Sequence, residues 1–122
     1  MNKLIAGKWE AKNIRLMRYL IKNQDVVLDL GTGSGLTSTF SAKIAKKVVT
    51  VEHRVKTLDY AKKNHKLNNV DVECILATLT PELLINLVEK FKPTVILCDI
   101  EGDELKLLDN EWTTGVRTII ME

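Results

Sequence analysis

Residues 26–35 read Val-Val-Leu-Asp-Leu-Gly-Thr-Gly-Ser-Gly, and this stretch decides the fold. An apolar run with one carboxylate, Asp29, breaks here into three glycines at alternate positions. Such a run is typical of a buried parallel strand that turns sharply into a helix, because glycine tolerates positive φ and lets a ligand approach the backbone. The stretch therefore predicts a strand over 26–30 that ends in a ligand-binding turn.

A second acidic residue, Glu52, follows Asp29 by 23 residues. Between them an apolar residue recurs at every fourth position, at Leu36, Phe40 and Ile44. Residues 48–52 then form a run rich in β-branched side chains. These segments predict one βαβ unit, in which the acidic residue ending the second strand contacts ribose hydroxyls. The alternatives are a glycine turn with nothing bound and a site for a different nucleotide.

The glycine spacing separates this turn from the dinucleotide-binding fingerprint. That fingerprint requires its third glycine at position 36, which is Leu36 here, whereas the third glycine is Gly35. Asp29 stands two residues before Gly31, where its carboxylate would face the ligand. A cofactor with an ammonium and a sulfonium fits such a carboxylate better than one with two phosphates.

Residues 29–35 resemble the first motif of class I S-adenosylmethionine (SAM) methyltransferases, Asp-x-Gly-x-Gly-x-Gly. The resemblance implies that SAM and its product S-adenosylhomocysteine (SAH) bind here. The residues assigned to the methionine part of the cofactor and to the turn are Asp29, Gly31, Thr32, Gly33 and Gly35. Glu52 is assigned to the ribose, and His53 borders the ribose or the adenine. Adenine contacts after the third strand are left open between the backbone and Thr78.

The rest of the chain alternates strand-like and helix-like segments. The expected strands are 26–30, 48–52, 70–75, 94–99 and 116–121. Strict alternation predicts an α/β fold, a Rossmann-like, doubly wound and mostly parallel sheet with strand order 3-2-1-4-5 and helices on both faces. We expect a single domain over 1–122, with an N-terminal helical segment over 1–24 and a Rossmann-like core over 25–122.

The end of the fourth expected strand is crowded with carboxylates, at Asp99, Glu101, Asp103 and Glu104. Like charges beside a crevice repel one another unless a cation or hydrogen-bond donors meet them, which favours a binding role. Asp103 is interpreted as a first-turn residue that complements a helix dipole. Asp99 and Glu101 are the candidate catalytic residues, as general base for a hydroxyl acceptor, and Asp99 also borders the cofactor.

The segment Asp99-x-Glu101-Gly102-x-Glu104, together with the ending Thr118-Ile119-Ile120-Met121-Glu122, resembles the signature of FkbM-type methyltransferases. This resemblance implies O-methylation of a small-molecule or saccharide hydroxyl, with Asp99, Glu101 and Glu104 on the reaction side. The fourth strand is not followed by Asn-Pro-Pro-Tyr, which favours oxygen or carbon acceptors. Two alternatives stay open, a SAM-binding module without turnover and an RNA methyltransferase.

Charge is unevenly distributed although the net charge is only +2. Residues 1–66 hold 14 basic and 5 acidic side chains, whereas residues 67–122 hold 4 and 11. Many of the cations fall on two helices expected on one face of the sheet, at Lys43, Lys46, Lys47, Lys56, Lys62, Lys63 and Lys66. A basic face can bind nucleic acid, but without interleaved aromatics we interpret it as a solvated surface that His65 shares.

The remaining composition points to a cytoplasmic protein without membrane contact. The chain has no apolar run long enough to cross a bilayer. Cys74 and Cys98 lie in strand-like runs without ligand-like neighbours at metal spacing, so no metal is expected.

The sequence ends at Glu122, directly after the fifth expected strand. Methyltransferase sheets usually continue with a further helix and a β-hairpin, so we expect the C-terminal hairpin to be missing. Strand 5 would then be a bare apolar edge, because it carries none of the charges or prolines that protect edges. The expectation is a truncated chain or self-association through strand 5.

Overall fold

The computed structural model describes residues 2–3, 9–98 and 115–121. The strands in these residues are β1 (Asn2–Lys3), β2 (Val26–Leu30), β3 (Lys47–Glu52), β4 (Glu73–Leu76), β5 (Val95–Cys98) and β6 (Thr118–Met121). The helices are α1 (Trp9–Leu20), α2 (Leu36–Ala42), α3 (Val55–Leu67) and α4 (Pro81–Phe91).

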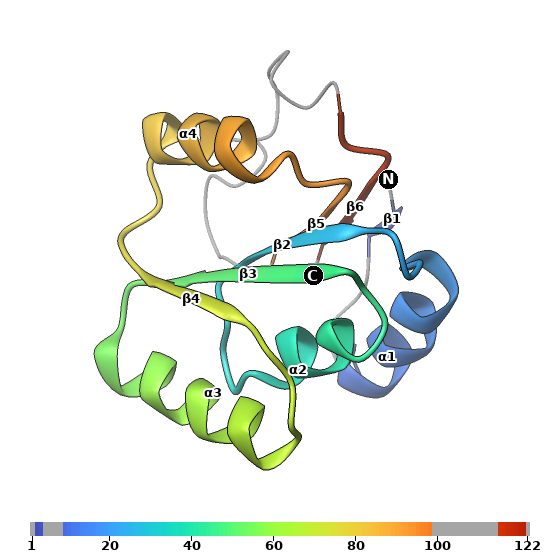
Figure 1. Ribbon diagram of the computed structural model, residues 1–122, viewed down its shortest axis with the longest axis horizontal. Helices are drawn as coiled ribbons and strands as arrows, with labels where there is room; N and C mark the ends of the chain where they lie inside the picture. The colour runs from blue at the N-terminus through green and yellow to red at the C-terminus, as the bar shows by residue number, and fades with distance from the viewer. Residues whose placement is uncertain (1, 4–8, 99–114, 122) are drawn as a thin grey trace.

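All six described strands form one parallel sheet in the order β1-β6-β5-β2-β3-β4 (Figure 1). The five expected strands correspond to β2 to β6, and their predicted order of 3-2-1-4-5 is confirmed. The winding reverses between β2 and β5, which pair side by side although α2, α3 and α4 separate them in sequence. In open α/β sheets, ligands bind at the carboxyl ends of the strands where the winding reverses.

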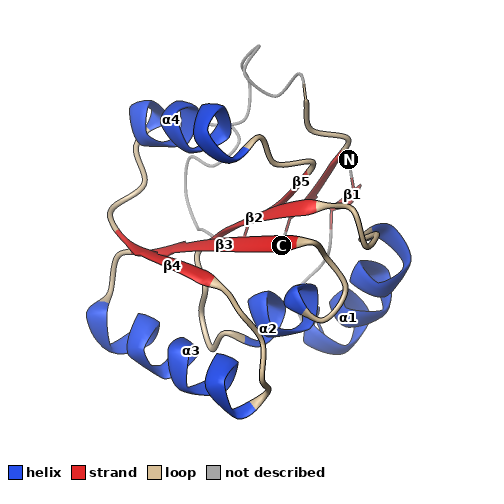
Figure 2. Cartoon of the chain, in the orientation of Figure 1, coloured by secondary structure: helices blue, strands red, loops and turns tan. Residues whose placement is uncertain are grey.

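Helices cover both faces of the sheet, as the alternation predicts. α1, α2 and α3 lie on one face and α4 on the other (Figures 1 and 2). Strand β2 is almost entirely buried, and its alternate residues enter two cores: Val27 packs with Met17 of α1, and Leu28 with Leu84 of α4. A strand covered on both faces is mostly apolar on both, which explains the four apolar residues around Asp29 at 26–30.

Local sequence signals set the ends of α4. The Thr80 hydroxyl accepts a hydrogen bond from Leu83 N at 3.1 Å, and Pro81 occupies the first helical position. The helix ends at Phe91, its C-cap Lys92 has a left-handed φ of 50°, and Pro93 follows. The strand expected at 70–75 is found later, at Glu73–Leu76, because Asn69 with φ 54° follows the end of α3 and the extended segment begins beyond it.

The expectation of a bare strand 5 is wrong. Asn2 pairs with Ile120 and Lys3 with Met121, so β1 adds a parallel strand at the outer edge of β6. Two polar residues give no strand signal by composition, and only the long-range pairing with β6 makes them a strand. Ile120, expected on an open edge, is buried.

A buried carboxylate joins the elements at the amino end of the sheet. Asp25 is 2% exposed and accepts hydrogen bonds from Lys22 N at 2.6 Å, Thr94 Oγ1 at 2.8 Å and Arg117 Nε at 3.2 Å. Arg117 Nη2 also bonds Asp25 and donates to Leu20 O at 2.6 Å. Burial raises the pKa of Asp25, but the bonds from Arg117, Lys22 and Thr94 outweigh it and hold the pKa below its usual value.

Replacing Asp25 by Asn should lower the free energy of unfolding by about 2–3 kcal/mol at pH 7, because charged hydrogen bonds are lost and Arg117 keeps no anionic partner. Urea unfolding measures the loss. In the wild type this contribution is present above pH 4 and declines as the pH falls through the lowered pKa. Asp71→Asn, at an exposed position, is the matched control, and equal losses in the two variants would contradict the assigned role.

Candidate functional site

The predicted turn lies where the carboxyl ends of the parallel strands meet. Gly31 N, directly after β2, donates to Val51 O of β3 at 2.9 Å, and Ala77 N, directly after β4, donates to Glu52 O at 3.0 Å. These two bonds carry the sheet pairing past the strand ends. They bring the glycine turn, Glu52 and the segment after β4 to one edge of the sheet.

Three glycines shape the turn, and each has a left-handed backbone. The φ angles are 89° at Gly31, 53° at Gly33 and 84° at Gly35. The positive φ of Gly33 favours glycine. A Cβ at this position would meet nothing within 4 Å, so the space beside the backbone is open to a ligand. A Cβ at Gly35 would lie 2.8 Å from both Cα and Cβ of Ala61, so this glycine also lets α2 pack directly on α3.

Asp29 is a buried carboxyl with one oxygen unpartnered. Its side chain is 1% exposed, and Oδ2 accepts a hydrogen bond from Thr50 Oγ1 at 2.9 Å. Oδ1 is buried without a hydrogen-bond partner in the described part of the chain. Burial, together with the charge of Glu52, raises the pKa of Asp29 to about 7 against the opposing effect of the Thr50 bond. A cation placed here would draw the group into its ionised form.

Glu52 is a buried carboxylate held in the ionised form. Its Oε2 accepts hydrogen bonds from His53 N and Arg54 N, both at 3.0 Å, and from Arg54 Nε at 3.1 Å. Burial raises the pKa of Glu52, but the bonds and charge of Arg54 outweigh it and lower the pKa below its usual value. All of these bonds go to Oε2, and Oε1 takes part in none of them.

The other predicted cofactor residues differ in their settings. Thr32 is buried, and its hydroxyl lies 3.5 Å from Ser38 Oγ inside the protein. His53 is exposed, with Nδ1 3.4 Å from Glu52 Oε2, and Thr78 is exposed just beyond β4. The acidic segment with Asp99, Glu101, Asp103 and Glu104 lies outside the described residues, immediately after β5.

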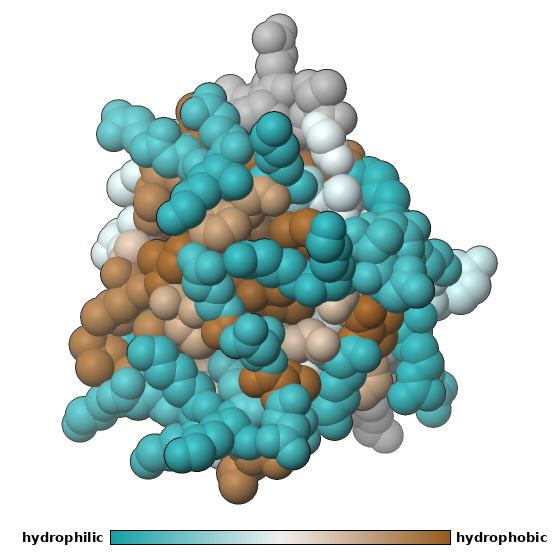
Figure 3. Space-filling model, viewed as in Figure 1, coloured by the Kyte–Doolittle hydropathy of each residue, from teal (hydrophilic) through white to brown (hydrophobic). Residues whose placement is uncertain are grey.

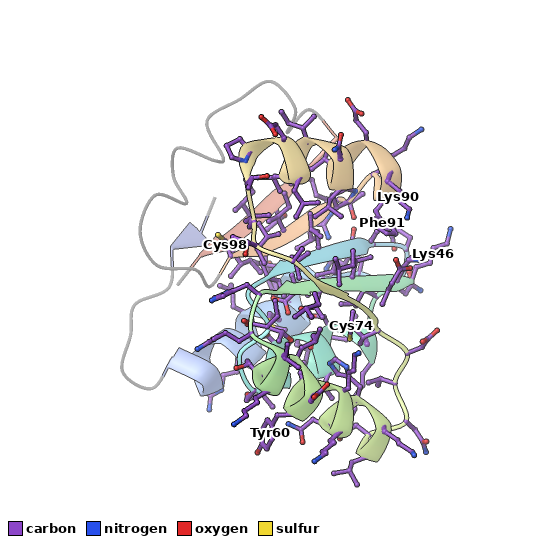
Figure 4. The ribbon with its side chains drawn as sticks, turned by 90° about the vertical axis from the view of Figure 1, so that its left-hand side faces the viewer. Lys46, Tyr60, Cys74, Lys90, Phe91 and Cys98 are labelled. Atoms are coloured by element: carbon purple, nitrogen blue, oxygen red, sulfur yellow. The ribbon has the colours of Figure 1, made fainter. Side chains whose placement is uncertain are left out.

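The expectation that His65 faces solvent is wrong. His65 is 5% exposed, its Nε2 lies 2.7 Å from Ser38 Oγ, and its Nδ1 lies 3.7 Å from Cys74 Sγ. Figure 4 shows Cys74 between β4 and α3, on the side of the strand that faces the helix. Burial lowers the pKa of His65, so the ring is neutral near pH 7. His65 follows Leu58 by seven positions and Ala61 by four, on one helix face, and this spacing is the signal that the charge pattern obscured.

The lysine-rich helices do share a face, as predicted. Exposed lysines lie on or just after α2 and α3, at Lys43, Lys46, Lys56, Lys62, Lys63 and Lys66. Lys47 belongs to β3 instead and pairs with Glu73 at 3.2 Å. Hydrophilic residues gather over α3 and α4 in Figure 3, and hydrophobic ones show between the two helices. In the described ranges, no helix is long and apolar enough to span a membrane, and no cluster of three candidate metal ligands occurs.

Comparison with known proteins identifies a family that matches most of this chain. Residues 11–118 match the family "Ribosomal protein L11 methyltransferase (PrmA)". A ribosomal protein L11 methyltransferase of Dictyoglomus thermophilum is 44% identical over 66 residues, 53% of this chain and 22% of that protein. An uncharacterized RNA methyltransferase of Clostridium tetani is 34% identical over 92 residues, 73% of this chain and 20% of that protein. The chain thus spans about a fifth of the length of each relative. The matching family is not the FkbM-type family that the sequence around Asp99 resembles.

Solved structures share the fold at low identity. The precorrin-6y C5,15-methyltransferase of Geobacter metallireducens has a TM-score of 0.73 at 20% identity, covering 99% of this chain and 65% of that one. An RNA methyltransferase of Salinibacter ruber, solved in complex with SAH, has a TM-score of 0.65 at 22% identity, covering 86% of this chain and 68% of that one. At these identities the likeness establishes the methyltransferase fold.

Asp29→Asn should remove a pH dependence of stability. Because the pKa of Asp29 is raised from 3.8 to about 7, the folded chain keeps a proton between these pH values that the unfolded chain has lost. Wild-type stability therefore loses a contribution as the pH rises through that window. The unfolding free energy of the variant minus that of wild type should therefore rise by about 2–4 kcal/mol as the pH is raised from 4 to 8.

Urea unfolding of both proteins across that range checks this expectation. Asp25, whose lowered pKa gives the opposite slope, is common to both proteins and cancels in the difference. A difference that stays constant with pH would show that Asp29 is ionised in the folded chain already.

Proposed function

The chain belongs to the ribosomal protein L11 methyltransferase family, and on that premise we propose that it binds SAM at the glycine turn and takes part in methyl transfer. The observation that carries the proposal is the pair of buried carboxyls at this turn, each with one oxygen left for a ligand. Asp29 Oδ1 is buried and unpartnered among the described residues, and Glu52 Oε1 is outside the bonds that hold Oε2. SAM supplies an electrophilic methyl group on a sulfonium.

In this proposal each carboxyl meets a different part of the cofactor. Glu52, ionised and rigidly held, accepts hydrogen bonds from the ribose hydroxyls. Asp29 compensates the positive charge of the methionine part and becomes ionised as the cofactor binds. The turn contributes backbone at Gly31, Thr32, Gly33 and Gly35, since the Thr32 hydroxyl points inward. His53 and Thr78 border the ribose and adenine.

Asp99 and Glu101 remain the proposed reaction-side residues. β5 ends at Cys98 beside β2, so the acidic segment starts from the strand end that flanks the turn. Methyl transfer requires a nucleophile in line with the sulfonium and about 3 Å from the methyl carbon, so positioning supplies much of the rate. A carboxylate that accepts the acceptor's proton completes the reaction.

For the acceptor, RNA is favoured over the small-molecule hydroxyl that the FkbM-type resemblance implies. The exposed lysines of α2 and α3 form a cationic surface on one face of the sheet, suited to phosphates. RNA offers the oxygen and carbon acceptors that fit the absence of an Asn-Pro-Pro-Tyr sequence after β5. A ribosomal protein is the second candidate, favoured by the family match.

Glu52→Gln should weaken SAH binding by about 1.5–3 kcal/mol, since a charged hydrogen-bond acceptor becomes neutral. Calorimetry with SAH measures the change. Glu73→Gln, an exposed carboxylate at the opposite end of the sheet, is the control and should bind like wild type. Circular dichroism establishes that both variants are folded. An unchanged dissociation constant in Glu52→Gln would remove this residue from the site.

Transfer of a labelled methyl group from SAM to ribosomal RNA, ribosomal proteins or a panel of hydroxyl compounds should favour RNA. Replacing Lys62 and Lys66 by Ala should reduce transfer to RNA several-fold. The same change should lower the slope of log affinity against log salt concentration by about one for each phosphate that is no longer neutralised. SAH affinity should not change in this variant. Transfer to protein or small molecules alone would contradict the RNA proposal while leaving SAM binding intact.

A further inference from the structure

One turn of α3 faces the glycine turn with three successive contacts. Ala61 lies against Gly35, at the distance where any Cβ on residue 35 would clash. Asn64 Nδ2 donates to Ser34 O at 2.6 Å. His65 Nε2 lies 2.7 Å from Ser38 Oγ, in the first turn of α2. Residues that hold the turn therefore come from a helix that follows it by about 30 positions in sequence.

The hydrogen bonds around His65 have a consistent direction. Ser38 Oγ donates to Gly35 O at 3.1 Å, so the hydrogen of this hydroxyl is used and its oxygen accepts from His65 Nε2. The neutral ring then carries its hydrogen on Nε2, and Nδ1 lies 3.7 Å from Cys74 Sγ, whose thiol donates to Val72 O at 3.7 Å. The chain of donors runs from His65 of α3 through Ser38 to the carbonyl of Gly35.

The glycine turn has few hydrogen bonds of its own, from Gly35 N to Thr32 O at 2.9 Å and from Leu36 N to Ser34 Oγ at 3.4 Å. Gly35 is the N-cap of α2, with φ 84° and no side-chain cap. Side-chain capping usually supplies about 1 kcal/mol at this position. The bonds from α3 act on the carbonyls of Ser34 and Gly35, and because peptide groups are planar, they also set the direction of the following N–H groups.

We infer that Asn64 and His65 are positioning residues, which hold the glycine turn in the conformation that takes the cofactor. The inference rests on the proposed function for the identity of the ligand, whereas the contacts that carry it are present in the chain itself. Asn64 and His65 act through Ser34, Gly35 and Ser38 and need not touch the cofactor. His65 also connects the turn to β4 through Cys74.

A matched pair of substitutions at position 65 tests the inference. The amide nitrogen of Gln reaches about as far as Nε2 of histidine, whereas that of Asn reaches only as far as Nδ1. His65→Gln therefore keeps a donor toward Ser38, and His65→Asn loses it. Asn64→Ala removes the other bond at a half-buried position, where the fold tolerates the change. Asp59→Asn, exposed on the same helix, is the control.

Two measurements are needed, and the first uses no ligand. Amide hydrogen exchange of Gly35 and Thr39, whose N–H groups bond Thr32 O and Gly35 O at 2.9 Å, reports the order of the turn. His65→Asn and Asn64→Ala should each speed this exchange by about tenfold, the factor expected for one hydrogen bond. SAH affinity should fall by about fivefold to tenfold in the same variants, and His65→Gln and Asp59→Asn should resemble wild type in both measurements.

The two measurements separate the outcomes. Unchanged exchange in both His65→Asn and Asn64→Ala overturns the positioning role, whatever the ligand. Faster exchange with unchanged SAH affinity overturns the link between the turn's order and binding. A wild-type chain that fails to bind SAH overturns the proposed function, and the ligand-free exchange still decides whether α3 holds the turn. If His65→Asn does not fold, Asn64→Ala carries both measurements.

Discussion

The structure depends on a backbone constraint, the left-handed φ of three glycines between β2 and α2. At these angles the chain leaves the central strand and starts a helix within five residues, which places α2 on the sheet and against α3. Gly35 serves two purposes at once, because it adopts the angle and vacates the volume that Ala61 fills. The open backbone at Gly33 and the two buried carboxyls then lie at one edge, so the constraint that forms the fold also forms the candidate site.

Much of this could be predicted from local patterns. The apolar runs at 26–30 and 48–52 predict buried strands, and the spacing of Asp29 and Glu52 predicts their common edge, because parallel strands end together. Features made by distant partners could not be predicted. β1 exists only through its pairing with β6, and the lysines around His65 concealed a residue whose partners are on α2 and β4. The residues around Asp99 suggested the FkbM-type family, which the family match over residues 11–118 does not show.

The exposed lysines and the carboxyls of the candidate site occupy different parts of the chain. The exposed lysines lie on the face covered by α2 and α3, whereas the ionised Glu52 and the glycine turn lie at the strand ends. Grooves of about 600 and 700 Å³ flank residues 68–73 at the amino end of β4 and are lined by several of these lysines. A polyanion bound to these grooves would contact α3, the same helix that holds the glycine turn through Asn64 and His65.

The Asp25 cluster has a consequence for the time course of folding. Its bonds join residues 69 and 92 positions apart, to Thr94 and Arg117, whereas β2 and β3 pair residues only about 21 apart. Closing long loops costs more conformational entropy, so we expect the β2–β3 unit to form early and the Asp25 bonds to close late. Interactions absent from the transition state slow unfolding without speeding folding. The lifetime of the folded chain, more than the rate at which it forms, then depends on one carboxylate at the edge opposite the glycine turn.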